Sequence, residues 1–128
     1  MLYTYTAVIT ESDGTFYTKV PDVDGCITTA PSLPEAIALI SDALNLCLVC
    51  LEDEGITPNP PTPQSAIPHR PEDILTIIQA DTIKYRSLTD TKAVRKNVSL
   101  PAWLSNLADN RGINCSKVLQ DALISILS

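Results

Sequence analysis

The residues best placed to do chemistry lie in a short segment near the end of the chain, from Val94 to Leu100. Its alternate positions carry polar side chains, namely Arg95, Asn97 and Ser99. In an extended segment alternate side chains share a face, so these three would point one way and the apolar ones the other. Arginine and asparagine can form paired hydrogen bonds with the edges of guanine and adenine. The pattern therefore predicts a strand that recognises bases in the major groove of DNA.

Other residues with chemical potential are few and scattered. Asp22 and Asp24 are the only closely spaced carboxylates at a predicted strand edge, and the glycine after them favours a turn over a two-metal nuclease site. Cys47 and Cys50 have the spacing of a metal or redox motif, but they fall within a helical apolar pattern and no second pair exists. His69, the single histidine, lies in a proline-rich stretch. We therefore expect no catalytic residues, no metal and no cofactor.

Two short helices are predicted to follow the polar strand and to position it. Pro101 suits the first turn of a helix, Gly112 suits a left-handed helix end, and Asn114 suits the N-cap of a second helix. The free amide groups at the start of that second helix, with Ser116 and Lys117 beside them, are suited to hold a DNA phosphate. Asn114, Ser116 and Lys117 therefore join the predicted DNA-binding residues.

Both helices carry an apolar stripe that a single chain has no obvious means to cover. The inner positions are Trp103, Leu104, Leu107 and Ala108 in the first helix, and Val118, Leu119, Ala122, Leu123, Ile126 and Leu127 in the second. A lone strand and two short helices cannot bury a sufficient core. We therefore expect a homodimer, in which two strands form an antiparallel ribbon over four helices. The alternative is a helical hairpin that packs on the first part of its own chain.

The first part of the chain predicts an α+β unit with the element order β-β-β-α-β(-α). Strand-forming residues occupy 2–10, 15–20, 26–30 and 74–79, and a short helix begins within 81–86. The long helix starts after an N-cap at Ser32, with Glu35 three residues later, and stops at Gly55. Its predicted buried face is Leu33, Ile37, Ile40, Leu44, Cys47, Leu48 and Leu51. An irregular proline-rich crossover covers about 56–72. The predicted domains are 1–86 and 94–128, joined by a linker at 87–93.

The charge is divided between the two parts of the chain. The net charge of −6 combines −9 in residues 1–80 with +3 in residues 81–128. Opposite fields favour two partners of opposite charge, although an acidic surface without any partner would look the same. The start of the chain lacks a basic segment and an apolar run, and the longest apolar stretch, Leu46 to Leu51, is too short to span a membrane. We expect a cytoplasmic protein with no membrane partner.

Taken in order, several segments resemble the HicB family of antitoxins. In the first part the resemblance lies in the tyrosine-rich opening strand, Phe16 to Val20, Pro21 to Thr28, and Leu33 to Ala36. In the second part it lies in Val94 to Pro101, Trp103-Leu104, and Gly112 to Leu123. The second set also looks like a ribbon-helix-helix domain. The resemblance covers nearly the whole chain except the proline-rich crossover, which is longer than the family leads us to expect.

The resemblance implies a fold and two partners. It implies that residues 1–86 have a partial ribonuclease-H-like fold and bind a small basic toxin, HicA, that cleaves RNA. It also implies that the dimeric ribbon-helix-helix domain binds the operator DNA of its own operon, with a higher oligomer left open. On the acidic unit we expect the toxin to contact a set of carboxylates and tyrosines: Tyr3, Tyr5, Glu11, Asp13, Tyr17, Asp22 and Asp24.

Two other functions compete with a non-enzymatic antitoxin. The first is a stand-alone ribbon-helix-helix repressor whose first domain senses a small ligand. A single histidine disfavours metal sensing, but an organic ligand is compatible with the sequence. The second is a ribonuclease, for which the carboxylate cluster is missing. The neighbouring gene distinguishes them, because an antitoxin needs a small basic toxin encoded beside it.

Overall fold

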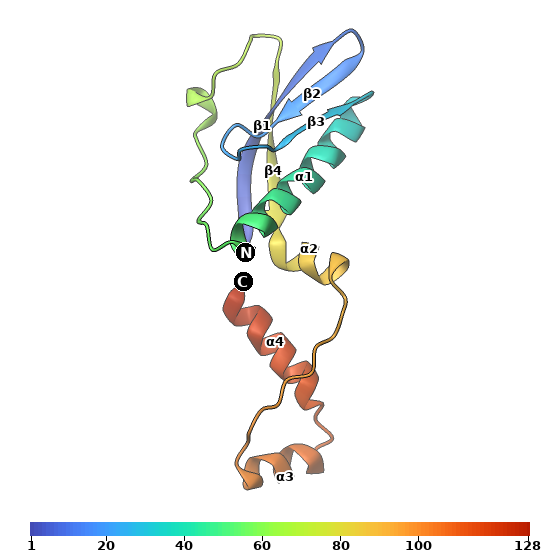
Figure 1. Ribbon diagram of the computed structural model, residues 1–128, viewed down its shortest axis with the longest axis vertical. Helices are drawn as coiled ribbons and strands as arrows, with labels where there is room; N and C mark the ends of the chain where they lie inside the picture. Colours follow the sequence, from blue (N-terminus) through green and yellow to red (C-terminus); the bar gives the residue numbers. More distant parts are fainter.

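The computed structural model describes all 128 residues. It shows an α+β unit at one end, an extended segment, and a pair of helices at the other end, which gives the molecule an elongated shape (Figure 1). The elements are β1 (Leu2–Ser12), β2 (Thr15–Lys19), β3 (Ile27–Ala30), α1 (Leu33–Asp53), the 3-10 helix η1 (Gln64–Ala66), β4 (Ile74–Asp81), α2 (Thr82–Thr89), α3 (Ala102–Asn110) and α4 (Cys115–Leu127). The predicted order of the α+β unit is confirmed.

The four strands form one antiparallel sheet in the order β3-β2-β1-β4. The tight β1–β2 turn places Asp13 and Gly14 at positive φ, 51° and 78°, a conformation that glycine adopts without strain. β2 pairs only with the second half of β1, from Val8 onward, whereas β4 pairs with β1 from Leu2 to Ile9. The first half of β1 therefore has a strand neighbour on one side only.

α1 lies across one face of the sheet and supplies much of the core. The Ser32 hydroxyl accepts a hydrogen bond from the Glu35 amide, and Gly55 has φ +71° just past the helix end, so both predicted helix boundaries are confirmed. The fully buried positions are Ala36, Ile40, Leu44 and Leu48. These buried residues repeat every four positions and begin at Ala36, one residue before Ile37. Ile37 is therefore at the margin and 38% exposed, which corrects its predicted burial.

The core between α1 and the sheet explains the apolar character of α1. By length and composition α1 is apolar enough to cross a membrane. Its buried stripe, however, packs against Tyr5, Ala7 and Ile78 from the sheet, together with Val20 and Cys26 from the loop between β2 and β3. Fully burying a side chain of this kind stabilises the fold by roughly 1.5–3 kcal/mol. The helix is therefore held to the sheet by its apolar stripe.

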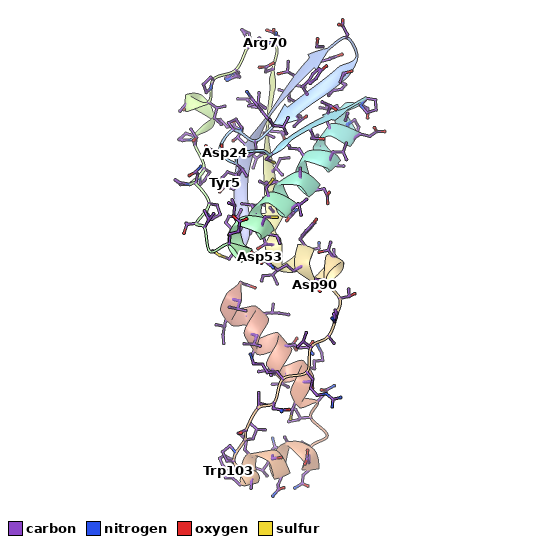
Figure 2. The ribbon with its side chains drawn as sticks, in the orientation of Figure 1. Tyr5, Asp24, Asp53, Arg70, Asp90 and Trp103 are labelled. Atoms are coloured by element: carbon purple, nitrogen blue, oxygen red, sulfur yellow. The ribbon has the colours of Figure 1, made fainter.

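The proline-rich segment has the irregular, extended form that the sequence predicts. α1 ends beside the start of β1, so the chain must travel back along the sheet before β4 can run antiparallel to β1 (Figure 1). Figure 2 shows Asp53 near one end of this path and Arg70 near the other. Proline favours extended backbone of about 3.1 Å per residue, which suits such a long return. One residue of the segment, Ile67, is buried with 4% exposure.

The join between the two parts differs from the prediction in one respect. α2 continues to Thr89, so it includes the first residues of the predicted linker at 87–93. The segment without regular secondary structure runs from Asp90 to Pro101. The predicted strand at 94–100 is therefore not formed in the single chain. A strand needs a hydrogen-bonded neighbour, and this chain offers none there, so pairing with a second copy stays a prediction.

Candidate functional site

Tyr3 and Tyr5 are held by internal hydrogen bonds. The Tyr5 side chain is 3% exposed, and its hydroxyl donates to the Asn59 carbonyl oxygen at 2.5 Å. The half-buried Tyr3 donates its hydroxyl hydrogen to Glu52 Oε2 at 2.7 Å. The pKa of Tyr3 is raised to about 12, mainly by burial and secondarily by this hydrogen bond. The buried Tyr5 ring belongs to the core, so it is not available as an exposed anchor for a partner.

Glu52 is the centre of a hydrogen-bond network that the sequence analysis missed. Its carboxylate accepts from Tyr3, from Thr82 Oγ1 at 2.9 Å and from Arg86 at 3.2 Å. Burial opposes ionisation of Glu52, but these hydrogen bonds outweigh it, and its pKa is lowered. Arg86 also contacts Asp53 at 2.9 Å and the Val49 carbonyl at 3.3 Å. The network fixes α2 to the end of α1, close to where the extended segment begins.

A signal for this network exists in the sequence. Ala36, Ile40, Leu44 and Leu48 repeat every four residues, and Glu52 is the next position of the same stripe. A carboxylate on a buried stripe requires partners, because an unpaired buried charge is costly. The stripe therefore predicts a hydrogen-bonded Glu52, although the identity of its partners depends on the tertiary fold.

Asp22 anchors the proline-rich segment. Its carboxylate accepts from the Thr62 amide at 2.8 Å and from the Thr62 hydroxyl at 2.5 Å, and its backbone carbonyl accepts from the Asn59 side chain at 3.0 Å. These bonds occupy Asp22 with the fold, whereas Asp24 in the same loop is exposed. The carboxylates of Asp22 and Asp24 therefore do not converge on a shared metal site. No group of three or more histidine, cysteine or acidic side chains with metal-binding geometry occurs in the chain.

The other candidate residues of the α+β unit lie on its surface. Glu11 and Asp13 are exposed at the β1–β2 turn, and Asp24 is exposed in the loop after β2. Tyr17, on β2 between these acidic positions, is 49% exposed. The seven predicted contact residues are thus divided by the structure. Tyr3, Tyr5 and Asp22 hold the fold, and Glu11, Asp13, Tyr17 and Asp24 face solvent.

Tyr17 belongs to an apolar patch on the sheet face that α1 does not cover. The registers Tyr17↔Thr29 and Lys19↔Ile27 place these residues on one face, opposite the buried Thr18 and Val20. Ile27 is 67% exposed. A shallow cavity of about 270 Å³ lies here, lined by Val8, Thr10, Tyr17, Thr18, Lys19 and Ile27. Apolar side chains with acidic neighbours suit a protein contact better than a small-molecule reaction. We call Tyr17 and Ile27 the open-face patch.

The two C-terminal helices leave their apolar faces uncovered. Neither α3 nor α4 contains a buried residue. In α3 the Trp103 side chain is 65% exposed, and in α4 Val118 and Leu123 are 56% and 45% exposed. Figure 2 shows Trp103 at the far end of the molecule, well away from the sheet. Such faces are typical of an interface, because a soluble chain rarely exposes so much contiguous apolar surface.

The predicted DNA-binding residues lie on both sides of α3. Arg95, Asn97 and Ser99 are exposed in the segment before α3. The Asn114 side chain accepts from the Lys117 amide at 3.2 Å, which confirms it as the N-cap of α4, and Gly112 has φ +65°, which confirms the left-handed stop. The ammonium group of Lys117 lies 3.3 Å from Asp121 in an exposed pair. Base and phosphate contacts by these residues stay a prediction.

The cysteines show no shared ligand site. Cys26 is fully buried. Its thiol pKa is raised to about 12, mainly by burial and secondarily by its contact with Cys47. Cys47 is half-buried against the core, while Cys50 and Cys115 are exposed. A buried thiol with a high pKa is a poor nucleophile, so Cys26 acts as a small apolar side chain.

Comparisons with known proteins give one family and several structures. The family described as "HicB_like antitoxin of bacterial toxin-antitoxin system" matches residues 5–121. No curated protein sequence matches the chain. A "Toxin-Antitoxin complex from Streptococcus pneumoniae" is similar in structure, with a TM-score of 0.61, 20% identity, and coverage of 98% of this chain and 99% of that chain.

Two further solved structures are similar to the chain. An "Antitoxin HicB3 crystal structure" has a TM-score of 0.53 and 26% identity, and the match covers 94% of this chain and 95% of that one. A "HicA3 and HicB3 toxin-antitoxin complex" has a TM-score of 0.50 and 22% identity, with coverage of 62% of this chain and 99% of that one. The fold is thus shared over most of the chain.

Proposed function

The chain belongs to the family of HicB-like antitoxins of bacterial toxin–antitoxin systems, and we propose that it binds and silences a HicA-like toxin that cleaves RNA. The observation that supports this most is the open-face patch, in which Tyr17 and Ile27 are exposed. The patch lies within residues 1–80, which carry a net charge of −9. We propose that residues 1–86 have the partial ribonuclease-H-like fold that the family resemblance implies. We expect this unit to act by binding alone, because the Asp22 carboxylate is already bound by Thr62.

Silencing requires only that the antitoxin covers the toxin's active site. A specific contact commonly buries about 1,200–2,000 Å² in total, with most of the energy in a few aromatic or apolar anchors. Tyr17 and Ile27 are the anchors that the open face offers. The exposed carboxylates of Asp13 and Asp24 lie in the turns at the two ends of β2, and Glu11 lies near the first of these turns on the face that it shares with Phe16. All three would speed and orient the approach of a basic toxin. Tyr3, Tyr5 and Asp22 contribute indirectly, by holding the fold behind it.

The contact is tested by separating anchors from charges. The double variant Tyr17→Ala, Ile27→Ala should associate with the toxin at the wild-type rate. The lifetime of its complex should be at least tenfold shorter, because anchors act mainly on dissociation. Reversing Glu11, Asp13 and Asp24 to lysine should instead lower the association rate and its salt dependence. Asp42→Lys is the matched control, since Asp42 is exposed on α1, over the other face of the sheet. Surface plasmon resonance measures both rates. Equal effects of Asp42→Lys and the triple reversal would contradict the assignment.

We also propose that residues 94–128 form a dimeric ribbon-helix-helix domain that represses the chain's own operon. The uncovered faces of α3 and α4 and the unpaired segment before them support this, because both need a second copy to become covered. Arg95, Asn97 and Ser99 would then lie on the groove-facing side of the ribbon. Each good bidentate base contact is worth roughly 1–3 kcal/mol of discrimination.

DNA recognition is tested on the DNA upstream of the chain's own gene. Arg95→Ala should relax sequence preference, whereas Lys117→Ala should weaken binding to all sequences and reduce the salt dependence. Fluorescence anisotropy at several salt concentrations, with specific and scrambled duplexes, measures both. Unchanged affinity of the Arg95, Asn97 and Ser99 triple alanine variant would refute the recognition surface.

A stand-alone repressor that senses a ligand is the second candidate, and one cavity favours it. A space of about 670 Å³ lies between the α+β unit and the end of α4, with Tyr3, Ile56, Ile83 and Leu127 among its lining. This volume falls within the usual range for ligand pockets, about 300–1,000 Å³. The polar groups beside it, however, are already paired with one another through Glu52. Co-purification with the product of the adjacent gene favours the antitoxin.

A further inference from the structure

One half of the sheet face opposite α1 carries the proline-rich segment. In this half, formed by β1 and β4, Thr6 stands opposite Ile77, and both line a shallow hollow with residues 61–64. In the other half, formed by β2 and β3, the open-face patch of Tyr17 and Ile27 is exposed. A partner that contacts this face of the sheet therefore meets β2 and β3.

Lys19 stands beside the open-face patch and on the same face. Its neighbours across the sheet are Val8 on β1 and Ile27 on β3, and Tyr17 precedes it by two residues. The Lys19 side chain is exposed and helps to line the shallow cavity at the patch. No ion pair of the structure includes it. The ammonium group of Lys19 therefore has no charged partner within its own chain.

The sign of this charge is unexpected for its place. Lys19 is the only lysine or arginine in residues 1–69, and residues 1–80 carry a net charge of −9. Such a field attracts a basic toxin, yet the toxin would meet a cation within the contact. An ammonium group that is covered without a partner is strongly unfavourable. A toxin that covers the open-face patch therefore needs an acceptor for Lys19.

We propose that Lys19 selects the toxin by pairing with a carboxylate that the otherwise basic toxin presents to the open-face patch. This inference rests on the proposed toxin binding and adds the group that the toxin must carry. The apolar area of Tyr17 and Ile27 suits any apolar partner, and the acidic field attracts any basic protein. A charge pair within the patch is selective, because every partner without the carboxylate leaves the ammonium group unpaired. Lys19 is thus a specificity-determining residue.

A phosphate of a nucleic acid is the other anion that a lysine could meet. Proteins that bind nucleic acids gather several cations along one surface. Lys19 has no second lysine or arginine within residues 1–69, and Asp13 and Asp24 lie in the turns at the two ends of β2. These carboxylates repel phosphates, so the surroundings of Lys19 favour a single carboxylate on a basic protein.

The first test compares two charge reversals in the full chain by surface plasmon resonance, with the purified product of the adjacent gene as the toxin. Lys84→Glu is the matched control, because Lys84 is exposed on α2, beyond the sheet, and its reversal changes the net charge equally. The control should associate at least as fast as the wild type, since a more acidic chain attracts a basic toxin more strongly. Lys19→Glu should weaken binding by about 100-fold or more despite the same gain of negative charge, because two like charges then face each other.

The second test identifies the carboxylate and separates its loss from misfolding. Each aspartate and glutamate of the toxin is replaced by lysine in turn, and each toxin variant is measured against the wild-type chain and Lys19→Glu. One toxin variant should bind the wild-type chain about 100-fold more weakly and should recover binding with Lys19→Glu, because the pair is restored with its charges exchanged. A chain that had failed to fold would recover binding with no toxin variant.

The outcomes separate this inference from the proposed function. Equal behaviour of Lys19→Glu and Lys84→Glu would overturn the inference, whereas the proposed function stands because the toxin is still bound. Loss of binding that no toxin variant restores would overturn the pairing with a carboxylate. Binding of labelled RNA by the wild type that Lys19→Glu abolishes would assign Lys19 to a phosphate and equally overturn it. If the wild-type chain binds no toxin at all, the proposed function itself fails.

Discussion

Replacing Glu52 by alanine should destabilise the α+β unit strongly while sparing the helices at the other end. The substitution removes the acceptor for the Tyr3 hydroxyl and for one contact of Arg86. Thr82 also loses its bond to Glu52, but its hydroxyl lies 3.2 Å from the Met1 carbonyl and can donate there instead. Arg86 keeps Asp53 and the Val49 carbonyl. Two charged hydrogen bonds are thus lost, and the Tyr3 hydroxyl keeps only the weak acceptor Met1 Sδ at 3.7 Å.

The magnitude follows from the burial of this carboxylate. The Glu52 side chain is 21% exposed, so solvent screens its contacts only in part. Hydrogen bonds to charged groups contribute about 1.5–3 kcal/mol each, and we expect a loss of roughly 2–4 kcal/mol for Glu52→Ala. Asp53→Ala is the matched control, because its side chain is 61% exposed and also contacts Arg86. An exposed ion pair is worth about 0–1 kcal/mol.

The distribution of aromatic residues allows the two parts of the chain to be followed separately. All four tyrosines lie in the first part, at 3, 5, 17 and 85, and the single tryptophan is Trp103 in α3. Urea unfolding monitored by tyrosine circular dichroism therefore reports on the α+β unit, and tryptophan fluorescence reports on the helices. With an m-value of about 2 kcal/mol/M, Glu52→Ala should lower the tyrosine midpoint by roughly 1–2 M. Equal midpoints for Glu52→Ala and Asp53→Ala would refute the network as a stabilising element.

Three further outcomes are expected. Leu123→Asp should convert the dimer formed through α3 and α4 into monomers by analytical ultracentrifugation and shift Trp103 emission to the red, because a charge cannot be buried in that apolar interface; an unchanged mass would contradict the interface. Asp22→Ala should speed proteolysis within residues 58–66, since two hydrogen bonds to Thr62 are lost, and an unchanged cleavage rate would show that the proline-rich segment is held elsewhere. The pKa of Glu52 is lower in the folded chain than its unfolded value of about 4.3. The carboxylate therefore stabilises the fold above the unfolded pKa, and this contribution is lost as the pH falls through the folded pKa. Glu52→Gln should accordingly make the free energy of unfolding less dependent on pH in acid.

Local signals account for the elements that the sequence predicts correctly. The N-cap at Ser32, the helix end at Gly55 and the N-cap at Asn114 each depend on neighbouring residues only, and all three are present. Periodicity also placed the buried stripe of α1 to within one position, with Ile37 as the error.

The errors in the candidate site arise from contacts between distant segments. Tyr5 and Asp22 look like surface residues of a strand and a turn, but both are bound by the proline-rich segment, at Asn59 and Thr62. The path of that segment is set by the antiparallel placement of β4, which no local pattern reveals. The predicted strand at 94–100 raises a different problem, because its partner would come from another chain. A single sequence shows that such a strand needs pairing but not which strand it meets.

The central claim is that this chain silences an RNA-cleaving toxin by binding it. The most direct measurement is the cleavage of a labelled RNA by the purified product of the adjacent gene, titrated with the full chain. We predict that cleavage stops at one antitoxin chain per toxin and that a stable complex is isolated at the same ratio. Cleavage that continues in the presence of excess folded chain, with no complex formed, would contradict the claim.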